Sequence, residues 1–137
     1  MTEAQRKGTV NELLAAQYFI RKNCVVSKPL NDFSDYDLIV DTGVNVLRVQ
    51  VKTVSYSNSK RRYVAKLYNA HRKKDGTWDQ KTYDENSCDM IACVCQDEKL
   101  IYLVPIKLLA GRTGVTFYPT GKPKGKNYEA YRHELYD

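Results

Sequence analysis

The stretch Leu47-Arg48-Val49-Gln50-Val51-Lys52-Thr53 has the clearest regular pattern in this 137-residue chain. Its first three odd-numbered positions are apolar, and its even-numbered positions are Arg48, Gln50 and Lys52. Successive side chains of a β-strand point to opposite faces, so an alternation with a period of two predicts a strand over residues 47–53. Gln50 and Lys52 then lie on the same polar face.

A second strand is predicted just before the first. The run Tyr36–Val40 is mostly apolar, and the turn residues 41–43 join it to residues 47–53, which is typical of a hairpin. Asp37 begins this run, so its carboxylate is expected at the sheet edge near Gln50 and Lys52. Asp35 lies two residues earlier and can share the same face. Asp37 is favoured because Asp35 belongs to the preceding turn, but the choice between them stays open.

Apolar residues recur at steps of three and four over residues 2–22, which predicts an N-terminal helix. The stripe expected to be buried comprises Val10, Leu13, Leu14 and Tyr18. Glu12 lies one step from this stripe. Its carboxylate is therefore expected at the edge of the buried face.

Further strands are predicted over residues 89–95 and 100–105, followed by a short helix over 106–110. A helix packed against a mixed sheet is an α/β (α+β) architecture. At this length one domain over residues 1–137 is the expected organisation.

Two segments differ from this core. Residues 55–84 hold polar turn residues, a strand-like run over 62–68 and a charged loop, and we interpret them as a basic β-hairpin insertion. Residues 111–137 contain four glycines and two prolines, which predicts a loop or basic arm.

The composition favours a polyanionic partner. Lys and Arg number 22 against 16 Asp and Glu, giving a net charge of +6. No apolar run approaches the roughly 18 residues that a membrane span needs, and residues 1–14 lack a signal-peptide core, so a cytoplasmic location without membrane contact is expected. The four cysteines are then expected to be free thiols. No glycine-rich phosphate loop, HExxH or GxSxG motif is present, which disfavours nucleotide, zinc-protease and serine-hydrolase chemistry.

The converging polar residues suit phosphodiester hydrolysis. That reaction needs an oxygen-ligated divalent cation and a nearby positive charge. Asp37 offers a carboxylate, Gln50 a carbonyl oxygen and Lys52 a fixed charge, with Glu12 as an additional carboxylate. The alternative is an ordinary solvated strand face.

Asp37, the sequence Gln50-Val51-Lys52 on the next strand, and Glu12 upstream together resemble the active-site signature of the PD-(D/E)XK nuclease superfamily. Within it, the chain most resembles small intron-associated homing endonucleases of cyanobacteria and their phages, and more distantly the Holliday junction resolvases. Residues 83–92 and 101–105 are similar to the strand pair that follows the core in those families.

The resemblance implies a restriction-endonuclease-like core whose catalytic residues are Glu12, Asp37, Gln50 and Lys52. Asp37, Gln50 and Glu12 would bind Mg²⁺ or Mn²⁺, and Lys52 would contact the attacking water or the scissile phosphate. Tyr36 stands where the motif's name has proline, a position that is not a ligand. Gln50 replaces the usual acidic residue and so removes a negative charge. Because this should weaken the binding of a second cation, the site could hold either one metal ion or two.

A basic segment is the candidate DNA-binding surface. Its members are Lys60, Arg61, Arg62, Lys66, Arg72, Lys73 and Lys74. Such a ribbon can track phosphates and reach base edges in the major groove, or it can simply be a solvated hairpin. Residues 122–126 carry three more lysines, in either a phosphate-binding arm or a polar loop.

The leading hypothesis is a Mg²⁺-dependent, site-specific endonuclease that cuts double-stranded DNA as a homodimer or homotetramer in the cytoplasm of a bacterial or phage-infected cell. Symmetric copies are expected because one active site cuts one strand. The alternatives are a Holliday junction resolvase and a catalytically inert DNA-binding module.

Overall fold

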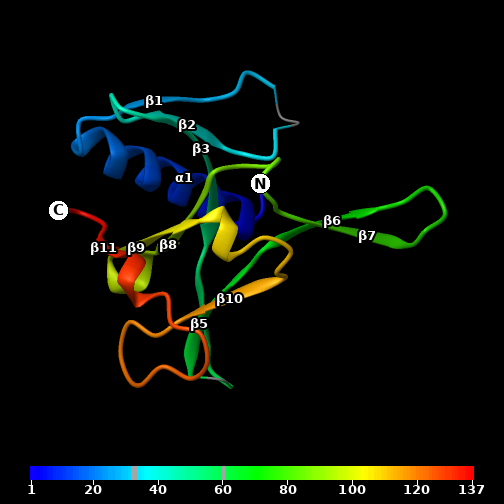
Figure 1. Cartoon of the computed structure of the whole chain (residues 1–137). Helices are drawn as coiled ribbons and strands as arrows, with labels where there is room; N and C mark the ends of the chain where they lie inside the picture. The colour runs from blue at the N-terminus through cyan, green and yellow to red at the C-terminus, as the bar shows by residue number, and fades with distance from the viewer. Residues whose placement is uncertain (32–33, 60) are drawn as a thin grey trace.

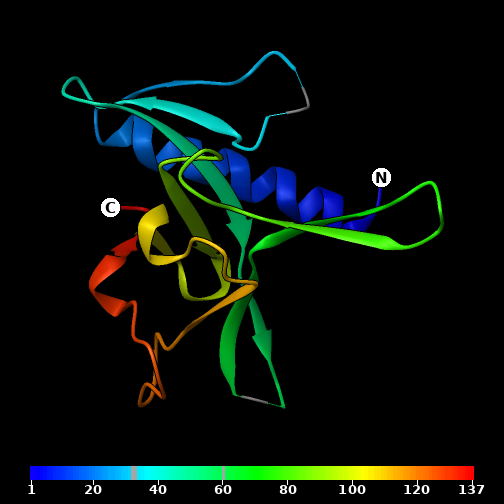
Figure 2. The same ribbon diagram turned by 45° about the vertical axis from the view of Figure 1, so that its right-hand side comes forward.

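The computed structural model describes residues 1–31, 34–59 and 61–137, and only the backbone of residues 70–72. A mixed sheet has the helix α1 on one face, and a smaller sheet packs on the other through a shared apolar core (Figures 1 and 2). This architecture confirms the expected mixed α/β (α+β) class. Flanking helices were expected beside the sheet. Among the described residues, the helical elements are α1 and short 3-10 turns.

The helix α1 spans Glu3–Arg21 and confirms the predicted N-terminal helix. It begins with a capping box, in which Thr2 and Gln5 each accept a hydrogen bond from the other's backbone amide. No helix in the described ranges is long and apolar enough to cross a membrane.

The predicted buried stripe of α1 was partly wrong. Val10 and Leu13 are exposed, whereas the fully buried positions include Asn11 and Ala15. The amide of Asn11 donates a hydrogen bond to Thr53 Oγ1 over 2.9 Å. The helix therefore rests on the sheet through small and hydrogen-bonding side chains, which hydrophobicity alone does not reveal.

The larger sheet has the strand order β1-β2-β3-β8-β9-β11. These strands are β1 (Val25–Ser27), β2 (Leu38–Asp41), β3 (Val46–Thr53), β8 (Met90–Cys95), β9 (Leu100–Pro105) and β11 (Arg132–Glu134). β3 and β8 run parallel, and the other neighbouring pairs run antiparallel. The predicted hairpin and the two later strands are confirmed.

The two faces of β3 differ as the alternation predicted. Val49 and Val51 pack in the apolar cluster that contains Ala15 and Phe19 of α1. The polar side chains at even positions point to the other face. Gln50 and Lys52 therefore share the face of β3 that is opposite to Val49 and Val51.

The segment after β3 forms β4 (Ser55–Ser57), β5 (Arg62–Lys66), β6 (Tyr68–Arg72) and β7 (Trp78–Thr82). The prediction of a single strand over residues 62–68 was wrong. The run divides at Leu67 into β5, which pairs with β4 and β10, and β6, which pairs with β7. At the division, the Leu67 amide donates a hydrogen bond to the Thr113 carbonyl over 3.0 Å. β6 and β7 form a hairpin that projects from the body (Figures 1 and 2). The insertion therefore contributes one core hairpin and one projecting hairpin.

The C-terminal segment is more ordered than a loop. β10 (Gly114–Phe117) joins the smaller sheet, and β11 pairs with β9. Phe117 and Leu135 are buried, and the ring of Phe117 stacks on Tyr102 with 4.0 Å between centroids. The prediction of a loop was wrong for both strands, because they are short and lie among glycines that form turns. The short helix predicted over 106–110 is a 3-10 turn at Ile106–Leu108.

Candidate active site

Asp37 lies at the residue before β2 and is tied to β3 at two points. Its amide donates to the Val49 carbonyl over 2.9 Å, and its Oδ2 accepts the Val51 amide over 2.9 Å. Val51 is the residue between Gln50 and Lys52. The antiparallel register of β2 and β3 therefore places the Asp37 carboxylate beside the motif on β3.

Gln50 and Lys52 occupy a partly dehydrated environment. Gln50 is buried, and its side-chain Nε2 donates a hydrogen bond to the Val51 carbonyl oxygen over 3.4 Å. The ammonium of Lys52 lies 4.9 Å from the centroid of the Tyr83 ring, a cation–π contact that helps to fix a long side chain. Lys52 lines a pocket of about 540 Å³ together with Lys7 and Lys66.

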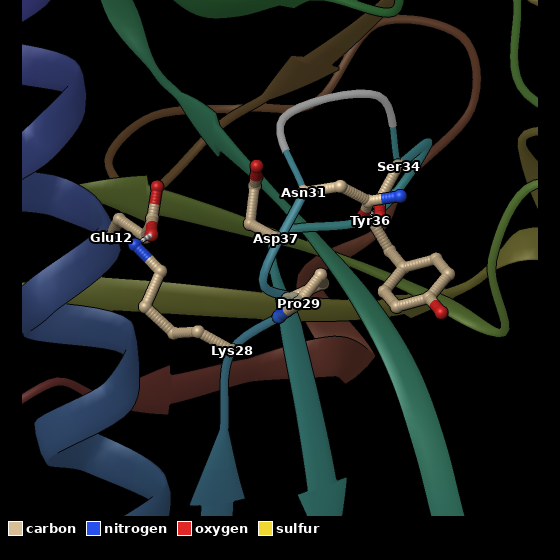
Figure 3. Close-up of a pocket in the computed structure, with 7 residues that line it drawn as sticks. All are labelled: Glu12, Lys28, Pro29, Asn31, Ser34, Tyr36 and Asp37. Carbon is tan, nitrogen blue, oxygen red and sulfur yellow. Dashed lines mark hydrogen bonds and ion pairs between the residues drawn. The ribbon is translucent and has the colours of Figure 1, made fainter.

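Glu12 faces Asp37 across a smaller pocket of about 160 Å³. Figure 3 shows Lys28 reaching the Glu12 carboxylate from the end of β1, with Asp37 beside them. Glu12 and Lys28 form an ion pair. The structure thus brings Glu12 and Asp37 together, places Lys52 in the neighbouring pocket, and leaves Gln50 lining neither of them.

The charges of this region influence one another. Burial raises the pKa of the Asp37 carboxyl and the nearby Glu12 raises it further, while the Val51 amide and the charges of Lys52 and Lys28 oppose the rise. Burial lowers the pKa of the Lys52 ammonium, and Asp37 counteracts that effect. Perturbed carboxyl and ammonium groups beside a pocket are typical of catalytic sites.

Asp35, the competing carboxylate, has a different environment. Its carboxylate forms an ion pair with Lys81 of β7, with 3.0 Å between Oδ2 and Nζ. It does not line the pocket that holds Glu12 and Asp37. The geometry therefore favours Asp37 as the metal ligand.

The donor set fits a hard divalent cation. No group of three His, Cys, Asp or Glu side chains gathers in the described part of the chain. Two carboxylates and the Gln50 carboxamide offer the oxygen ligands that Mg²⁺ and Mn²⁺ prefer. Repulsion between Glu12 and Asp37 contributes to the raised Asp37 pKa, and a divalent cation held by these two carboxylates would relieve it.

The candidate DNA-binding residues do not form one ribbon. Lys60 and the side chain of Arg72 lie outside the described residues. Arg61 and Arg62 lie at the start of β5, Lys66 ends β5 beside Lys52, and residues 73–74 follow β6 at the turn of the projecting hairpin. The described basic residues of this segment therefore lie at three separate positions: the start of β5, the end of β5 and the turn of the β6–β7 hairpin.

Two lysines near the site were not singled out in the sequence. Lys28 follows a three-residue strand and meets Glu12 only because β1 pairs with β2 and α1 crosses above them. Lys7 shares a pocket with Lys52 because α1 passes over β3. The proximity of each lysine depends on tertiary packing.

The sequence model of the family described as PD-(D/E)XK endonuclease matches residues 2–134, nearly the whole chain. The chain belongs to the PD-(D/E)XK endonuclease family. This match confirms the resemblance carried by Asp37, Gln50 and Lys52. The protein is a nuclease of a family that generally uses divalent metal ions.

Solved structures share the fold of this endonuclease. The bacterial homing endonuclease I-Ssp6803I is similar with a TM-score of 0.84 and 24% identity, over 96% of this chain and 89% of that chain. MepB is similar with a TM-score of 0.51 and 13% identity, over 100% of this chain and 99% of that chain. No curated protein matches the sequence. The first similarity confirms the expected restriction-endonuclease-like core.

Proposed function

We propose that this endonuclease is a Mg²⁺-dependent enzyme that cuts double-stranded DNA at specific sites, in the manner of a homing endonuclease. The observation that carries the proposal is the hydrogen bond from the Val51 amide to Asp37 Oδ2. It sets a half-buried carboxylate against the strand that carries Gln50 and Lys52, with Glu12 across the same pocket. The fold shared with a bacterial homing endonuclease supports the type of enzyme.

In this proposal Asp37, Gln50 and Glu12 hold the metal ion. Bound Mg²⁺ supplies charge neutralisation and activates water for attack on phosphorus. Mn²⁺ has similar oxygen preferences and is expected to substitute for it. Asp37 is oriented for this role because one of its oxygens is fixed by Val51, which leaves the other oxygen for the metal.

Lys52 contacts the attacking water or the scissile phosphate. Its ammonium is partly buried over the Tyr83 ring, and a charge in such a dehydrated site stabilises developing negative charge more strongly than one in bulk water. Lys7 and Lys66 line the same pocket and provide further positive charge for the phosphates of the DNA strand that is cut.

Sequence readout is assigned to the projecting β6–β7 hairpin. A two-stranded ribbon fits the major groove of B-DNA, where each base pair presents a distinct pattern of donors and acceptors. Residues 72–74 lie at the tip of this ribbon (Figure 1). Arg61, Arg62 and Lys60 are proposed to contact the flanking backbone.

A homo-oligomer, either a dimer or a tetramer, is proposed because cutting both strands requires at least two active sites. The exposed apolar side chains Val10, Leu13 and Ile20 lie along α1 at steps of three and seven residues. An exposed apolar stripe supports self-association. Leu13→Asp should lower the molecular mass measured by sedimentation, whereas Val44→Asp, at the exposed turn between β2 and β3, should leave it unchanged.

The deciding experiment compares wild type and Lys52→Ala on linear duplex DNA and on synthetic four-way junctions, with and without Mg²⁺. Discrete cuts in linear duplex that need Mg²⁺ and Lys52 are expected. Preferential cutting of junctions would instead identify a resolvase. Salt-sensitive binding without cutting by either protein would identify an inert DNA-binding module. Activity is proposed to take place in the cytoplasm of a bacterial or phage-infected cell.

A further inference from the structure

A second cationic region lies where the loop after β10 crosses β5. Two adjoining hollows, of about 400 and 160 Å³, share Arg62, Tyr118 and Lys124. The residues that line them include no Asp or Glu within the described part of the chain. Figures 1 and 2 show this loop at the opposite end of the molecule from the β1–β2 connection that borders the candidate active site.

Three residues that line the smaller hollow carry buried donors without a partner. In the described residues, the buried side-chain atoms without a hydrogen-bond partner are Arg62 Nε, Arg112 Nε, Tyr128 Oη and one oxygen of Asn11. The first three belong to residues that line this hollow, which we name the arginine pocket and define by Arg62, Arg112, Lys124, Lys126 and Tyr128. Buried donors are normally satisfied, so three together at one pocket indicate an acceptor supplied by a ligand.

Basic side chains are concentrated in this region. The basic residues lining the two hollows are Arg61, Arg62, Arg112, Lys122, Lys124 and Lys126. Among the described residues, no acidic side chain lines either hollow. Six of the 22 basic residues therefore gather around two hollows, and such a concentration of positive charge attracts an anion.

The pocket is held in shape by contacts that leave its donors free. The Tyr118 hydroxyl donates to the Lys124 carbonyl over 2.7 Å, which fixes the lysine-bearing loop. The nearby carboxylate of Glu129 accepts hydrogen bonds from the Tyr118 amide, the Tyr102 hydroxyl and Arg132. The carboxylate of Glu129 is thus held by these donors, and Glu129 lines neither hollow.

We propose that the arginine pocket binds a backbone phosphate of duplex DNA outside the segment that is cut. Two guanidinium groups, a hydroxyl and two ammonium groups match the oxygens of one phosphodiester. The inference rests on the proposed function, because it assumes that DNA is the substrate. It adds Arg112 and Tyr128 to the DNA-binding surface, and neither belongs to the basic segment around β5 and β6.

The test measures the salt dependence of duplex-DNA binding for wild type, Arg112→Met, Tyr128→Phe and the control Lys107→Met. Lys107 is exposed and lines neither hollow, so its loss removes one positive charge elsewhere. For Arg112→Met, the slope of log K against log salt should become shallower by about 0.9, the value for one lost phosphate contact. Tyr128→Phe should weaken binding with little change in slope, and Lys107→Met should match wild type.

Melting temperatures without DNA supply a second readout. Arg112→Met removes an unpartnered buried donor, so its melting temperature should equal or exceed that of wild type. A clear decrease would show that Arg112 is held by internal contacts and would overturn the inference.

The outcomes separate this inference from the proposed function. A wild-type slope for Arg112→Met, together with normal cleavage by the wild-type protein, overturns the pocket's role and leaves the proposed nuclease function intact. Absence of both DNA binding and cleavage by wild type overturns the proposed function and this inference together. An increase of melting temperature by inorganic phosphate that Arg112→Met abolishes, with an unchanged DNA slope, would assign the pocket to a free anion and overturn its assignment to DNA.

Discussion

The backbone amide of Val51 donates a hydrogen bond to Oδ2 of Asp37 over 2.9 Å. This contact joins the start of β2 to the strand that carries Gln50 and Lys52, and it holds a carboxylate that burial and Glu12 both disfavour as an anion. The raised pKa of Asp37 therefore reflects a carboxylate whose charged form is disfavoured at the candidate active site.

Asp37→Asn should abolish Mg²⁺-dependent cleavage and stabilise the metal-free fold at neutral pH. The asparagine oxygen can still accept a hydrogen bond from the Val51 amide, while the half-buried negative charge is lost. A carboxyl group whose pKa is raised on folding contributes stability at low pH and loses that contribution as pH rises through its folded pKa. The gain in melting temperature of the variant should therefore be largest near pH 7 and shrink towards pH ~3.9, the ordinary Asp value.

Asp35→Asn is the matched control for that variant. It removes an ion pair with Lys81 that is partly exposed, and such pairs contribute about 0–1 kcal/mol. Cleavage should stay near the wild-type rate. Loss of cleavage in Asp35→Asn, with normal activity in Asp37→Asn, would reverse the assignment of the metal ligand.

Lys52→Met should lower the rate of the cleavage step by roughly 10²–10³, the usual effect of removing one group that stabilises transition-state charge. Because burial lowers the pKa of Lys52, wild-type cleavage should fall as alkaline pH rises through that lowered pKa. Lys52→Arg keeps a charge that does not titrate in this range. Its residual activity should therefore lack this alkaline decline in single-turnover assays.

Lys28→Met should tighten Mg²⁺ binding. The Lys28 ammonium pairs with Glu12 and also lowers the pKa of Asp37, so it supplies positive charge where the metal is proposed to bind. Without it, less Mg²⁺ should be needed to raise the melting temperature of the DNA-free protein. Arg6→Met breaks the other ion pair of α1, with Glu3, and should leave the Mg²⁺ midpoint unchanged. A weaker Mg²⁺ response in Lys28→Met would contradict this competition.

The cysteines should differ sharply in reactivity. Burial raises the pKa of Cys88 and Cys95 to about 11 and that of Cys93 to about 12, whereas Cys24 is partly exposed. Only thiolates react efficiently with a disulfide reagent. Titration of the native protein should therefore give one fast thiol, lost in Cys24→Ser, and all four should react after unfolding. Fast reaction of Cys93 would contradict the buried environment.

Phe117→Ala should destabilise the protein by about 3–5 kcal/mol, the range for removing a buried aromatic side chain. Phe117 is fully buried against Tyr102 and Tyr128. Urea unfolding provides the measurement. Val44→Ala, at an exposed turn position, should change the stability by less than about 0.5 kcal/mol. Equal stability of the two variants would mean that the C-terminal segment is not part of the core.

The sequence by itself determined the elements with strong local patterns. The alternation over β3 fixed which face holds Gln50 and Lys52, because the period of two is a property of the extended backbone. The turn after β2 fixed the hairpin, and hence the neighbourhood of Asp37. These local rules were sufficient to predict the candidate catalytic residues and to support the resemblance that the family match confirms.

Tertiary structure alone decided which residues from distant segments meet. The pairing of β1 with β2 brought Lys28 to Glu12, and the crossing of α1 buried Asn11 in place of Leu13. The same applies to β10, which pairs with β5 and creates the arginine pocket beside Arg112. Side-chain periodicity reports which face of an element is apolar, whereas the partner of that face is chosen by the packing of the whole chain.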